Sequence, residues 1–446
     1  MTTDPLFWHR LQFGFTVTFH YIFPQLTMGL ALLIVLLKAR ALRTGNAAWN
    51  DAARFWIRIF GLSFAMGVVT GVPLEFQFGT NWAVFSHRAG GVIGQTLAME
   101  GIFAFFLESS FLGLLVWGER RLGERRHFAA ALALFAGSWL SGYFIIATNA
   151  FMQHPVGHAI LPDGTFRIES LARFVFNPWA IVQYLHNQAA AVVTGSFVMA
   201  AVGAFWTLRR EHSAAARASL ATGVVAGLIS SILVAFPTGD AQGKLVARHK
   251  PISLAAMEGR FESGPRAPLV VIGQPNVEER KLDNPIALPA VLSYLAYGSF
   301  SADVRGLLEF PESDWPDNIE LLYYSFHVMV GLGTILIAIA AIAAIFLARG
   351  RLSGARPVLW VLALTFPFPF IANTAGWMTA ELGRQPWLIH GLMRTAEGAS
   401  PTVHGGATLF TTLGFLGLYF VLGVLFLALV AKEVAHGPGP PAAERS

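Results

Sequence analysis

Long apolar stretches separated by short polar ones dominate this chain. The hydrocarbon core of a bilayer is about 30 Å thick, so a helix of roughly 20 apolar residues crosses it. Nine stretches reach that length, and they predict an all-α integral membrane protein of about nine transmembrane helices. The stretches are 14–37, 54–75, 94–118, 128–148, 187–208, 217–237, 321–348, 357–377 and 407–431.

The predicted helices form two groups around one long polar segment. Residues 1–237 hold the first six helices, residues 321–431 hold the last three, and residues 432–446 form a tail. Residues 238–320 are the one sizeable segment predicted outside the membrane, polar and interrupted by prolines. Apolar patches within it, such as "APLVVIG", predict that this segment packs partly on the membrane face.

Composition and charge agree with this pattern. The 446 residues are 54% hydrophobic and 13% charged, which is too apolar for an ordinary soluble domain. The segments after every odd-numbered span carry 17 of the 31 lysines and arginines, and eight of the others lie in the long segment, which is exempt from the positive-inside rule. We therefore expect a periplasmic N-terminus and a cytoplasmic C-terminus. The first span lacks the pattern of a signal peptide, so we expect it to be retained rather than cleaved. The net charge of +5 reflects this topology and does not indicate nucleic-acid binding.

Ionisable residues and a methionine gather near the outer face of the predicted bundle. The chain has no cysteine, so disulfides, cysteine-ligated iron–sulfur clusters and thioether-attached haem are excluded. A bound cofactor would need histidine, methionine or carboxylate ligands. Five such residues from five different spans share one layer, and they are His20, Glu100, His186, Met329 and Glu381. Charged groups inside a bilayer cost several kcal/mol each, so this layer predicts a functional site.

Each of these residues alone has an ordinary explanation. A buried histidine often bonds to a neighbouring helix, a methionine often fills a gap, and Glu381 could form an interfacial ion pair with Arg384. Their shared depth favours a cofactor site instead. A histidine and a methionine can fill both axial positions of a haem iron, as His186 and Met329 would, whereas a single strong ligand leaves one position open for oxygen. His20, Glu100 and Glu381 could supply two centres of the second kind.

The chain resembles subunit I of the bacterial cytochrome bd quinol oxidases along nearly its whole length. The resemblance rests on six motifs in family order: "RLQF" before His20, "EFQFGTNW" at 75–82, "MEGIFAFFLES" at 99–109, "LAAMEG" at 254–259, "VMVGLG" at 328–333 and "ELGRQPW" at 381–387. It implies His186 and Met329 as ligands of a low-spin haem b and Glu381 as the ligand of a high-spin haem b. His20, with Glu100 as a further candidate, is implied for haem d or a third haem b. Arg10, Trp377 and Arg384 are implied as further residues around the haems.

The resemblance also implies a reaction, its partners and a location. Residues 238–320 would be a short quinol-binding loop, as in a branch that includes cyanide-insensitive oxidases. Glu258 would accept a proton from ubiquinol or menaquinol, and Lys250 would bond to the other quinol oxygen. Oxygen would be reduced to water without proton pumping, with protons drawn from the cytoplasm through Glu108. A second integral subunit, a small single-span subunit and membrane lipid are the implied partners in the bacterial cytoplasmic membrane.

Several side chains extend or depart from the family pattern. We expect Ser109 and Ser141 to be partners of Glu108, and Trp387 with Trp377 to form flat walls at the bilayer interface. Ser253 stands where many members have lysine, and His327, where others have arginine, is expected beside a haem.

Two other classes of protein compete with this interpretation. A proton-coupled secondary transporter could use His20, Glu100 and Glu108 as a relay, but transporters usually show paired repeats that this chain lacks. A dihaem cytochrome b would need two histidine pairs on two helices, and that pattern is absent from the sequence.

Overall fold

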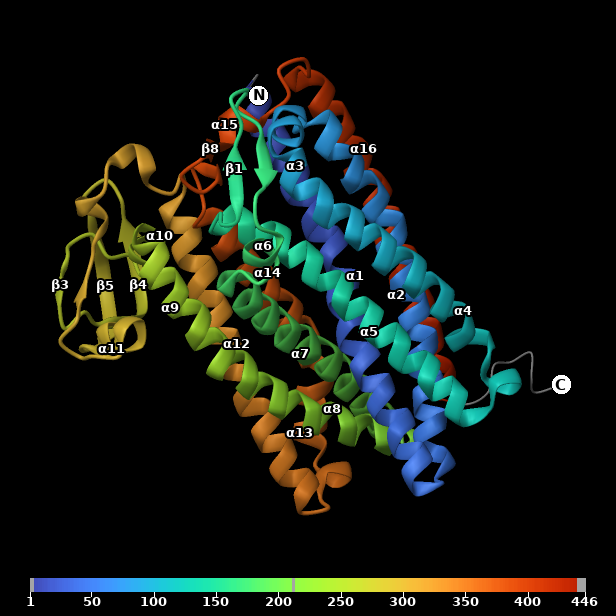
Figure 1. Cartoon of the computed structure of the whole chain (residues 1–446). Helices are drawn as coiled ribbons and strands as arrows, with labels where there is room; N and C mark the ends of the chain where they lie inside the picture. The colour runs from blue at the N-terminus through green and yellow to red at the C-terminus, as the bar shows by residue number, and fades with distance from the viewer. Residues whose placement is uncertain (1–3, 211–212, 439–446) are drawn as a thin grey trace.

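The computed structural model is an elongated bundle of helices with a small domain attached at one end (Figure 1). It describes residues 4–210 and 213–438. Eight helical stretches in these ranges are long and apolar enough to cross a membrane. They are Pro5–Thr44, Ala47–Thr80, Glu119–Gln153, Leu171–Leu208, Ala214–His249, Ile319–Ala348, Arg356–Leu382 and Gly405–His436.

The helices of these stretches keep their own labels. Single helices form five of the stretches: α1 (Pro5–Thr44), α2 (Ala47–Thr80), α5 (Glu119–Gln153), α12 (Ile319–Ala348) and α16 (Gly405–His436). The other three are built from consecutive pieces: α6 (Leu171–Val175) with α7 (Pro178–Leu208); α8 (Ala214–Leu233) with the π-helical segment η2 (Val234–Gly239) and α9 (Asp240–His249); and α13 (Arg356–Thr365) with α14 (Pro367–Leu382).

The third expected span, 94–118, differs from the other eight. Its residues are shared among α3 (Ala83–Glu100), the π-helical segment η1 (Gly101–Leu107) and α4 (Glu108–Trp117). No single α-helix of spanning length therefore covers this stretch within the described ranges. A π segment widens the turn and often marks a functional site.

Local sequence signals fix where the helices begin. Asp4, Asn46, Asn177, Ser213 and Asn318 are the N-cap residues of α1, α2, α7, α8 and α12, and each side chain accepts a hydrogen bond from a backbone N–H in the first turn. Such caps satisfy the unpaired N–H groups at a helix start and are worth about 1 kcal/mol each. The polar residues between the apolar stretches thus define the helix starts.

Close approach of small residues holds the centre of the bundle together. A Cβ added at Gly29 of α1 would lie 2.1 Å from the Ala191 carbonyl oxygen of α7, so the two backbones almost touch. Small residues allow this packing in membranes, where lipid chains are as apolar as leucine. Buried tryptophans join further helices: Trp56 Nε1 donates to Ser219 Oγ at 3.1 Å, and Trp206 Nε1 donates to the Val434 carbonyl oxygen at 2.9 Å.

Residues 250–318 form a separate unit beside the bundle, which we call the loop domain. It begins later than the expected loop because α9 continues the preceding span to His249. The central element is an antiparallel hairpin of β4 and β5. Its elements are α10 (Pro251–Met257), β3 (Gly264–Pro265), β4 (Leu269–Asn276), β5 (Lys281–Leu288), α11 (Val291–Tyr297), β6 (Asp303–Val304) and the 3₁₀ turns η3 (Leu307–Glu309) and η4 (Glu312–Asp314).

Shorter elements complete the connections. They are β1 (His158–Ile160), β2 (Phe166–Ile168), η5 (Leu352–Gly354), β7 (Trp387–Ile389), β8 (Met393–Arg394) and α15 (Thr395–Gly398). The β1–β2 and β7–β8 ribbons lie at the same end of the bundle as the loop domain (Figure 1). The molecule is thus mostly helical, with short ribbons that the expected all-α class did not include.

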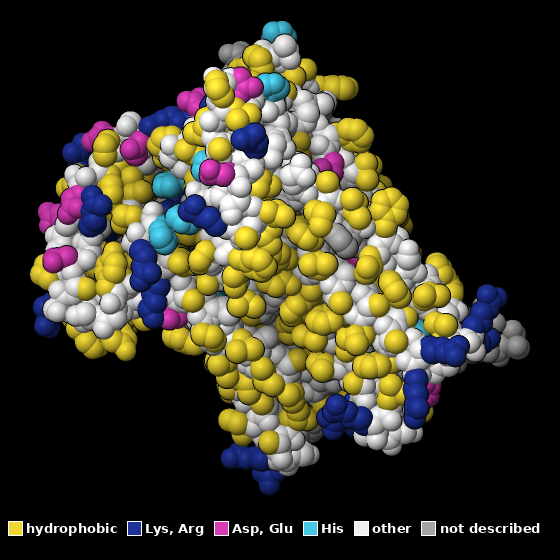
Figure 2. Space-filling model, in the orientation of Figure 1, with side chains coloured by type: hydrophobic (Ala, Val, Ile, Leu, Met, Phe, Trp, Pro, Cys, Tyr) yellow, Lys and Arg dark blue, Asp and Glu magenta, His cyan; other side chains and the backbone are white. Residues whose placement is uncertain are grey.

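The two ends of the bundle differ in charge. Lysine and arginine side chains stand almost alone at the end opposite the loop domain, whereas the loop domain mixes them with aspartate and glutamate (Figure 2). Helix α1 begins at the loop-domain end, and α16 finishes at the opposite end (Figure 1). Helix α16 runs to His436, into the expected tail, and residues 439–446 of that tail, including Arg445, lie outside the described residues.

Candidate functional site

His20 lies in the middle of α1 and faces α2. Its Nδ1 is 3.0 Å from Thr70 Oγ1, and a Cβ added at Gly71 would lie 3.0 Å from His20 Cε1. Thr70 also donates to the Met66 carbonyl oxygen at 2.8 Å, which holds the hydroxyl in place. The hydrogen bond at Nδ1 orients the ring, and Nε2 is then the nitrogen available to a metal.

Glu100 and Glu108 stand at the two ends of the π-helical segment η1. Ser141 Oγ donates to Glu100 Oε1 at 3.5 Å, and Glu75 of α2 lies within electrostatic range of Glu100. Glu108 has Ser138 of α5 within hydrogen-bonding range. The expected partners of Glu108 were therefore wrong: Ser141 bonds to Glu100, and Ser109 is exposed. Serines 138 and 141 lie three residues apart on α5, so one helix face serves both carboxyls.

His186 and Met329 each pack against a glycine of a neighbouring element. The Nδ1 of His186 is 3.3 Å from Thr238 Oγ1 in η2, and a Cβ added at Gly239 would lie 3.4 Å from its Cε1. On α12, Met329 lies against α14, where a Cβ added at Gly376 would be 2.9 Å from its Sδ. Each potential ligand thus has a glycine as a close neighbour, and His186 is also oriented by Thr238.

Glu381 lies at the centre of a dense polar network at the end of α14. Asn149 Nδ2 donates to Glu381 Oε1 at 2.8 Å, and Gln153 Nε2 reaches the same oxygen at 3.5 Å. Arg384 forms an ion pair with the other oxygen and also donates to the Leu388 carbonyl oxygen. The ion pair that was the alternative explanation for Glu381 is therefore present, with Arg384 4% exposed.

The amides of this network were missed by the sequence analysis. Asn149 and Gln153 lie four residues apart near the end of the apolar helix α5, and Gln183 Nε2 donates to Asn149 Oδ1 at 2.8 Å. Residues four apart share one face of a helix. Two amides at that spacing inside an apolar stretch were the signal that could have found them.

Lys250, which the resemblance implied for the quinol site, lies in the Glu381 network. Its side chain is 3% exposed, and Nζ donates to Gln153 Oε1 at 2.5 Å. Burial and, to a smaller extent, Arg384 lower the pKa of Lys250 to about 7, with Glu381 opposing the shift. Lys250 and Glu258 flank the two ends of α10, eight residues apart along the chain.

Glu258 lies under the hairpin of the loop domain. The residue is 3% exposed, and its Oε2 has no hydrogen-bond partner among the described residues. Burial raises the pKa of Glu258 to about 8, and a backbone hydrogen bond from Val270 opposes the shift. Tyr323 of α12 is close enough to interact electrostatically, and its hydroxyl is also without a partner in the part of the chain that the structure describes. Two buried, unpaired oxygens thus lie close together at this point.

His327 belongs to the Glu258 group rather than to the surroundings of Met329. Its ring stacks on Tyr323 with centroids 3.9 Å apart, and Nε2 lies 3.2 Å from the Val270 carbonyl oxygen. Positions 327 and 329 point to opposite sides of α12, because two residues turn a helix by about 200°. The structure therefore places His327 with Tyr323, on the other side of α12 from Met329.

The remaining predicted residues lie around these groups. Ser253 donates to the Gly383 carbonyl oxygen and ties α10 to the end of α14. Arg10 pairs with Asp317 at 2.7 Å, with both side chains about one-third exposed. Trp377 is half-buried one residue after Gly376, and Trp387 lies under the guanidinium of Arg394, 4.5 Å from its ring centroid.

The donor set fits haem by its chemistry. Imidazole, thioether and carboxylate are all ligands that haem iron takes in proteins, and each donor here is oriented by a hydrogen bond or a glycine contact. Arg384 Nε and His390 Nδ1 are buried polar atoms without partners among the described residues. A propionate of a haem near Glu381 would satisfy them.

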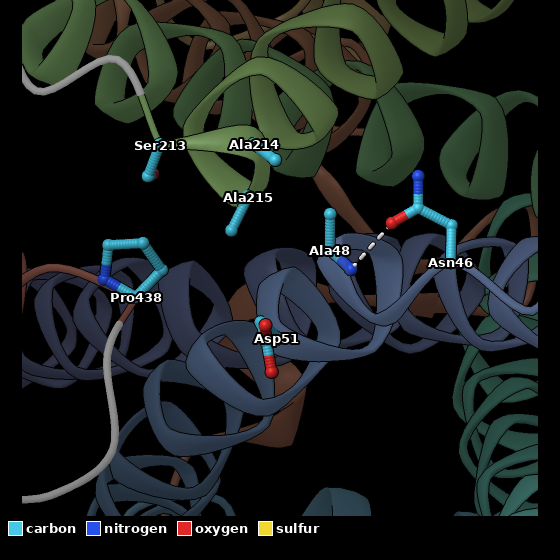
Figure 3. A pocket seen from close by; sticks show the side chains of 7 residues that line it. All are labelled: Asn46, Ala48, Asp51, Ser213, Ala214, Ala215 and Pro438. Carbon is cyan, nitrogen blue, oxygen red and sulfur yellow. Dashed lines mark hydrogen bonds between the residues drawn. The ribbon is translucent and has the colours of Figure 1, made fainter.

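A hollow of about 380 Å³ lies far from these groups (Figure 3). It opens between the start of α2, the start of α8 and Pro438. Asn46 Oδ1 accepts from the Ala48 N–H at 2.9 Å, so this polar side chain is a helix cap. None of the candidate ligands is among the residues that line it, and the hollow is a gap between helix ends.

Comparisons with known proteins agree on one family. The family described as Cytochrome bd terminal oxidase subunit I matches residues 8–438. The chain is 34% identical to cytochrome bd ubiquinol oxidase subunit 1 of Bacillus subtilis, covering 96% of this chain and 93% of that protein. It is 31% identical to cytochrome bd-II ubiquinol oxidase subunit 1 of Escherichia coli, with 98% and 97% covered. The solved structure of bd oxidase from Geobacillus thermodenitrificans superposes with a TM-score of 0.91 at 31% identity, covering 98% and 99% of the two chains.

Proposed function

The chain belongs to the cytochrome bd terminal oxidase subunit I family, and from this premise we propose how its residues carry out quinol oxidation and oxygen reduction. As a member, it is a multi-pass protein of the bacterial inner membrane and the haem-containing subunit of a quinol oxidase, paired with subunit II. The proposal concerns the ligands, the proton paths and the haem types. A small single-span subunit is part of the same proposal.

The haem ligands follow the layer of donors. His186 and Met329 would hold a low-spin haem b, Glu381 would hold a high-spin haem b, and His20, with Glu100 as a further candidate, would hold haem d or a third haem b. When bound, the haems carry electrons from quinol to oxygen and provide the open iron position at which oxygen is reduced. Thr70 and Thr238 fix the rings of His20 and His186 through their Nδ1 atoms.

Glu258 is the proposed proton acceptor for quinol. The observation that carries the proposal is its buried carboxyl with a free oxygen between the hairpin and α12. Tyr323, whose hydroxyl is also unpaired, would bond to the same quinol oxygen or to the one opposite. Because the loop domain lies at the end that the charge pattern predicts to be periplasmic, protons taken by Glu258 leave on that side.

Protons for water formation would come from the other side. Glu108 lies nearer the lysine- and arginine-rich end than Glu100, and Ser138 and Ser141 line the same face of α5. Because Glu108 has a single serine partner among the described residues, its carboxyl can rotate, and rotation would carry a proton from Glu108 towards Glu100. Protons would be taken up from the cytoplasm and released into the periplasm, and this would create the proton motive force without a pumping element.

The Glu381 network provides fixed charge around its haem. Arg384 pairs with the buried carboxylate of Glu381, and Lys250, with its pKa lowered to about 7, adds a second positive charge when it is protonated, and that charge requires a second anion. A haem propionate meets that requirement and would bond to the free Arg384 Nε. In this proposal Lys250 acts on the haem, whereas the quinol site consists of Glu258 and Tyr323.

A spectrum of the purified two-subunit complex tests the proposal. We expect a reduced-minus-oxidised spectrum with a low-spin haem b band that is lost in His186→Ala and in Met329→Leu, and a red band if the third haem is haem d. Quinol-dependent oxygen consumption should fall in both variants. A colourless complex, or low-spin signals that persist in both variants, would overturn it.

A further inference from the structure

The hairpin of the loop domain has two different faces. On the inner face, a Cβ added at Gly273 would lie 2.9 Å from the Tyr323 hydroxyl, and the backbone carbonyl oxygen of Val270 lies 3.2 Å from His327 Nε2. On the outer face, Ile272 pairs across the strands with Ile286, and Leu288 follows on the same side two residues later. These three side chains are 58%, 62% and 50% exposed. The hairpin therefore covers the Glu258 group with one face and presents bare aliphatic side chains with the other.

The two ends of the hairpin also differ in polarity. Its turn and adjoining strand ends carry the polar residues Asn276, Glu278, Glu279, Arg280, Lys281, Asp283 and Asn284. The other end is apolar and adjoins α11, because the Ala267 N–H donates to Ser293 Oγ at 2.8 Å. Tyr294 and Phe300 stack there with centroids 4.6 Å apart and are 48% and 53% exposed. We call Ile272, Ile286, Leu288, Tyr294 and Phe300 the lower edge.

The position of the lower edge relative to the bundle matches the membrane boundary. Helix α11 packs on α9, and Tyr297 of α11 donates to the Ala247 carbonyl oxygen of α9 at 3.2 Å. The apolar span that leads into α9 meets its first charged pair at Asp240 and Lys244, so the water–lipid boundary lies at the level of α9. Figure 1 shows the loop domain beside α9 and α12 rather than on top of the bundle, with α11 at its lower end.

We propose that the lower edge rests in the outer leaflet of the membrane, at the boundary between headgroups and acyl chains. Hydrophobic side chains line this edge and charged ones lie above it (Figure 2). Aromatic residues favour this boundary, and exposed aliphatic side chains gain free energy by leaving water. Arg248 of α9 and Arg266 beside β3 are exposed cations close to the edge, which suits the phosphates of bacterial lipids.

Lipid is favoured over a protein as the occupant because the surface is continuous with a membrane-facing helix. Strand β4 packs on α12, whose outward residues Leu321, Tyr324 and Val328 are more than 40% exposed at helical spacing. That face of α12 belongs to a span that is 17% buried within the chain. The hairpin and α12 thus pack together and each exposes apolar side chains that lipid can cover.

Single cysteines can test the depth of this edge, since the chain has none of its own. The variants Ile286→Cys and Phe300→Cys are spin-labelled in the two-subunit complex in nanodiscs of phosphatidylethanolamine and phosphatidylglycerol. Glu278→Cys, at the polar end of the hairpin, is the matched control, and the wild-type complex gives the background from subunit II. Size-exclusion chromatography confirms that each variant is assembled, so the test does not depend on oxidase activity.

The measurement is the collision rate of each label with oxygen and with a water-soluble nickel chelate. We expect oxygen collisions to exceed nickel collisions at positions 286 and 300 and the reverse at position 278. The water-exposed pattern at 286 and 300 would overturn the proposal. So would low collision rates with both reagents there, because that result would place a protein surface, from subunit II or a second copy, over the edge.

Discussion

The Glu258 carboxyl is deeply buried, and one of its oxygens has no hydrogen-bond partner among the described residues. That combination is unfavourable for a carboxyl with a purely structural role. An unpaired buried polar group costs about 1–3 kcal/mol. We predict that Glu258→Gln, which keeps the shape but cannot accept a proton, lowers quinol-dependent oxygen consumption by about 100-fold or more, as expected for loss of a general base. Haem absorption should be unchanged, and Glu278→Gln on the same loop is the matched control. Equal losses in the two variants would contradict the assignment.

The raised pKa of Glu258 gives this residue a defined pH dependence. Burial raises the pKa to about 8, so the carboxyl is mostly neutral at pH 7 and becomes a proton acceptor as the pH rises. We therefore predict that quinol oxidation increases between pH 7 and 9. Stability changes in the opposite sense, since the folded state binds more protons than the unfolded state between pH 4.5 and 8. Thermal unfolding temperature should fall over that range in the wild type and fall less in Glu258→Gln.

Lys250 allows a choice between the role implied by family resemblance and the one indicated by the structure. Its ammonium lies with Gln153, Arg384 and Glu381, so removing it takes positive charge away from the proposed high-spin haem. A nearby cation disfavours the oxidised, more positive haem, and we predict that Lys250→Met lowers the midpoint potential of that haem. Spectroelectrochemical titration measures the shift. A several-fold rise in KM for quinol with unchanged potentials would return Lys250 to the quinol site.

At the scale of elements, most of the helices could be predicted because hydropathy directly reflects what lipid requires. The interrupted third span could not be predicted that way, since the π-helical register of Gly101–Leu107 depends on backbone hydrogen bonds that composition does not encode. The hairpin was missed for another reason. Its inner face packs on α12, so the short strands Leu269–Asn276 and Lys281–Leu288 depend on contacts that are remote in sequence.

Contact between α12 and α14 offers a test of Met329 as a ligand. A Cβ added at Gly376 would lie 2.9 Å from Met329 Sδ. A methionine that only fills space can move aside, whereas one bound to iron cannot move without weakening the bond. We predict that Gly376→Ala shifts or abolishes the low-spin haem band. Gly417→Ala on α16, where an added Cβ meets no atom within 4 Å, is the matched control and should leave the spectrum unchanged.

At the scale of the whole molecule, the sequence indicated the layer of candidate ligands but not which neighbouring residues surround each candidate site. Resemblance implied Lys250 for the quinol site and His327 for the surroundings of a haem, and in the structure Lys250 bonds to Gln153 while His327 lies against Val270. His327 and Met329 are directed to opposite sides of α12, because two residues turn a helix by about 200°, whereas Lys250 and Glu258 stand at the two ends of α10. Which side faces which partner is set by tertiary packing, and one sequence alone does not reveal it.

The two-faced hairpin also connects the membrane to the quinol site. If the lower edge rests in lipid, a quinol with a long isoprenoid tail can reach Glu258 between the hairpin and α12 while its tail stays among acyl chains. We predict that Ile286→Asp, which places a charge on that edge, raises KM for a long-tailed quinol several-fold and has little effect on a short-tailed one. Steady-state oxygen consumption in nanodiscs measures both, with Glu278→Gln as control. An equal rise for both quinols would instead indicate distortion of the Glu258 group, because tail length matters only for a substrate that enters through lipid.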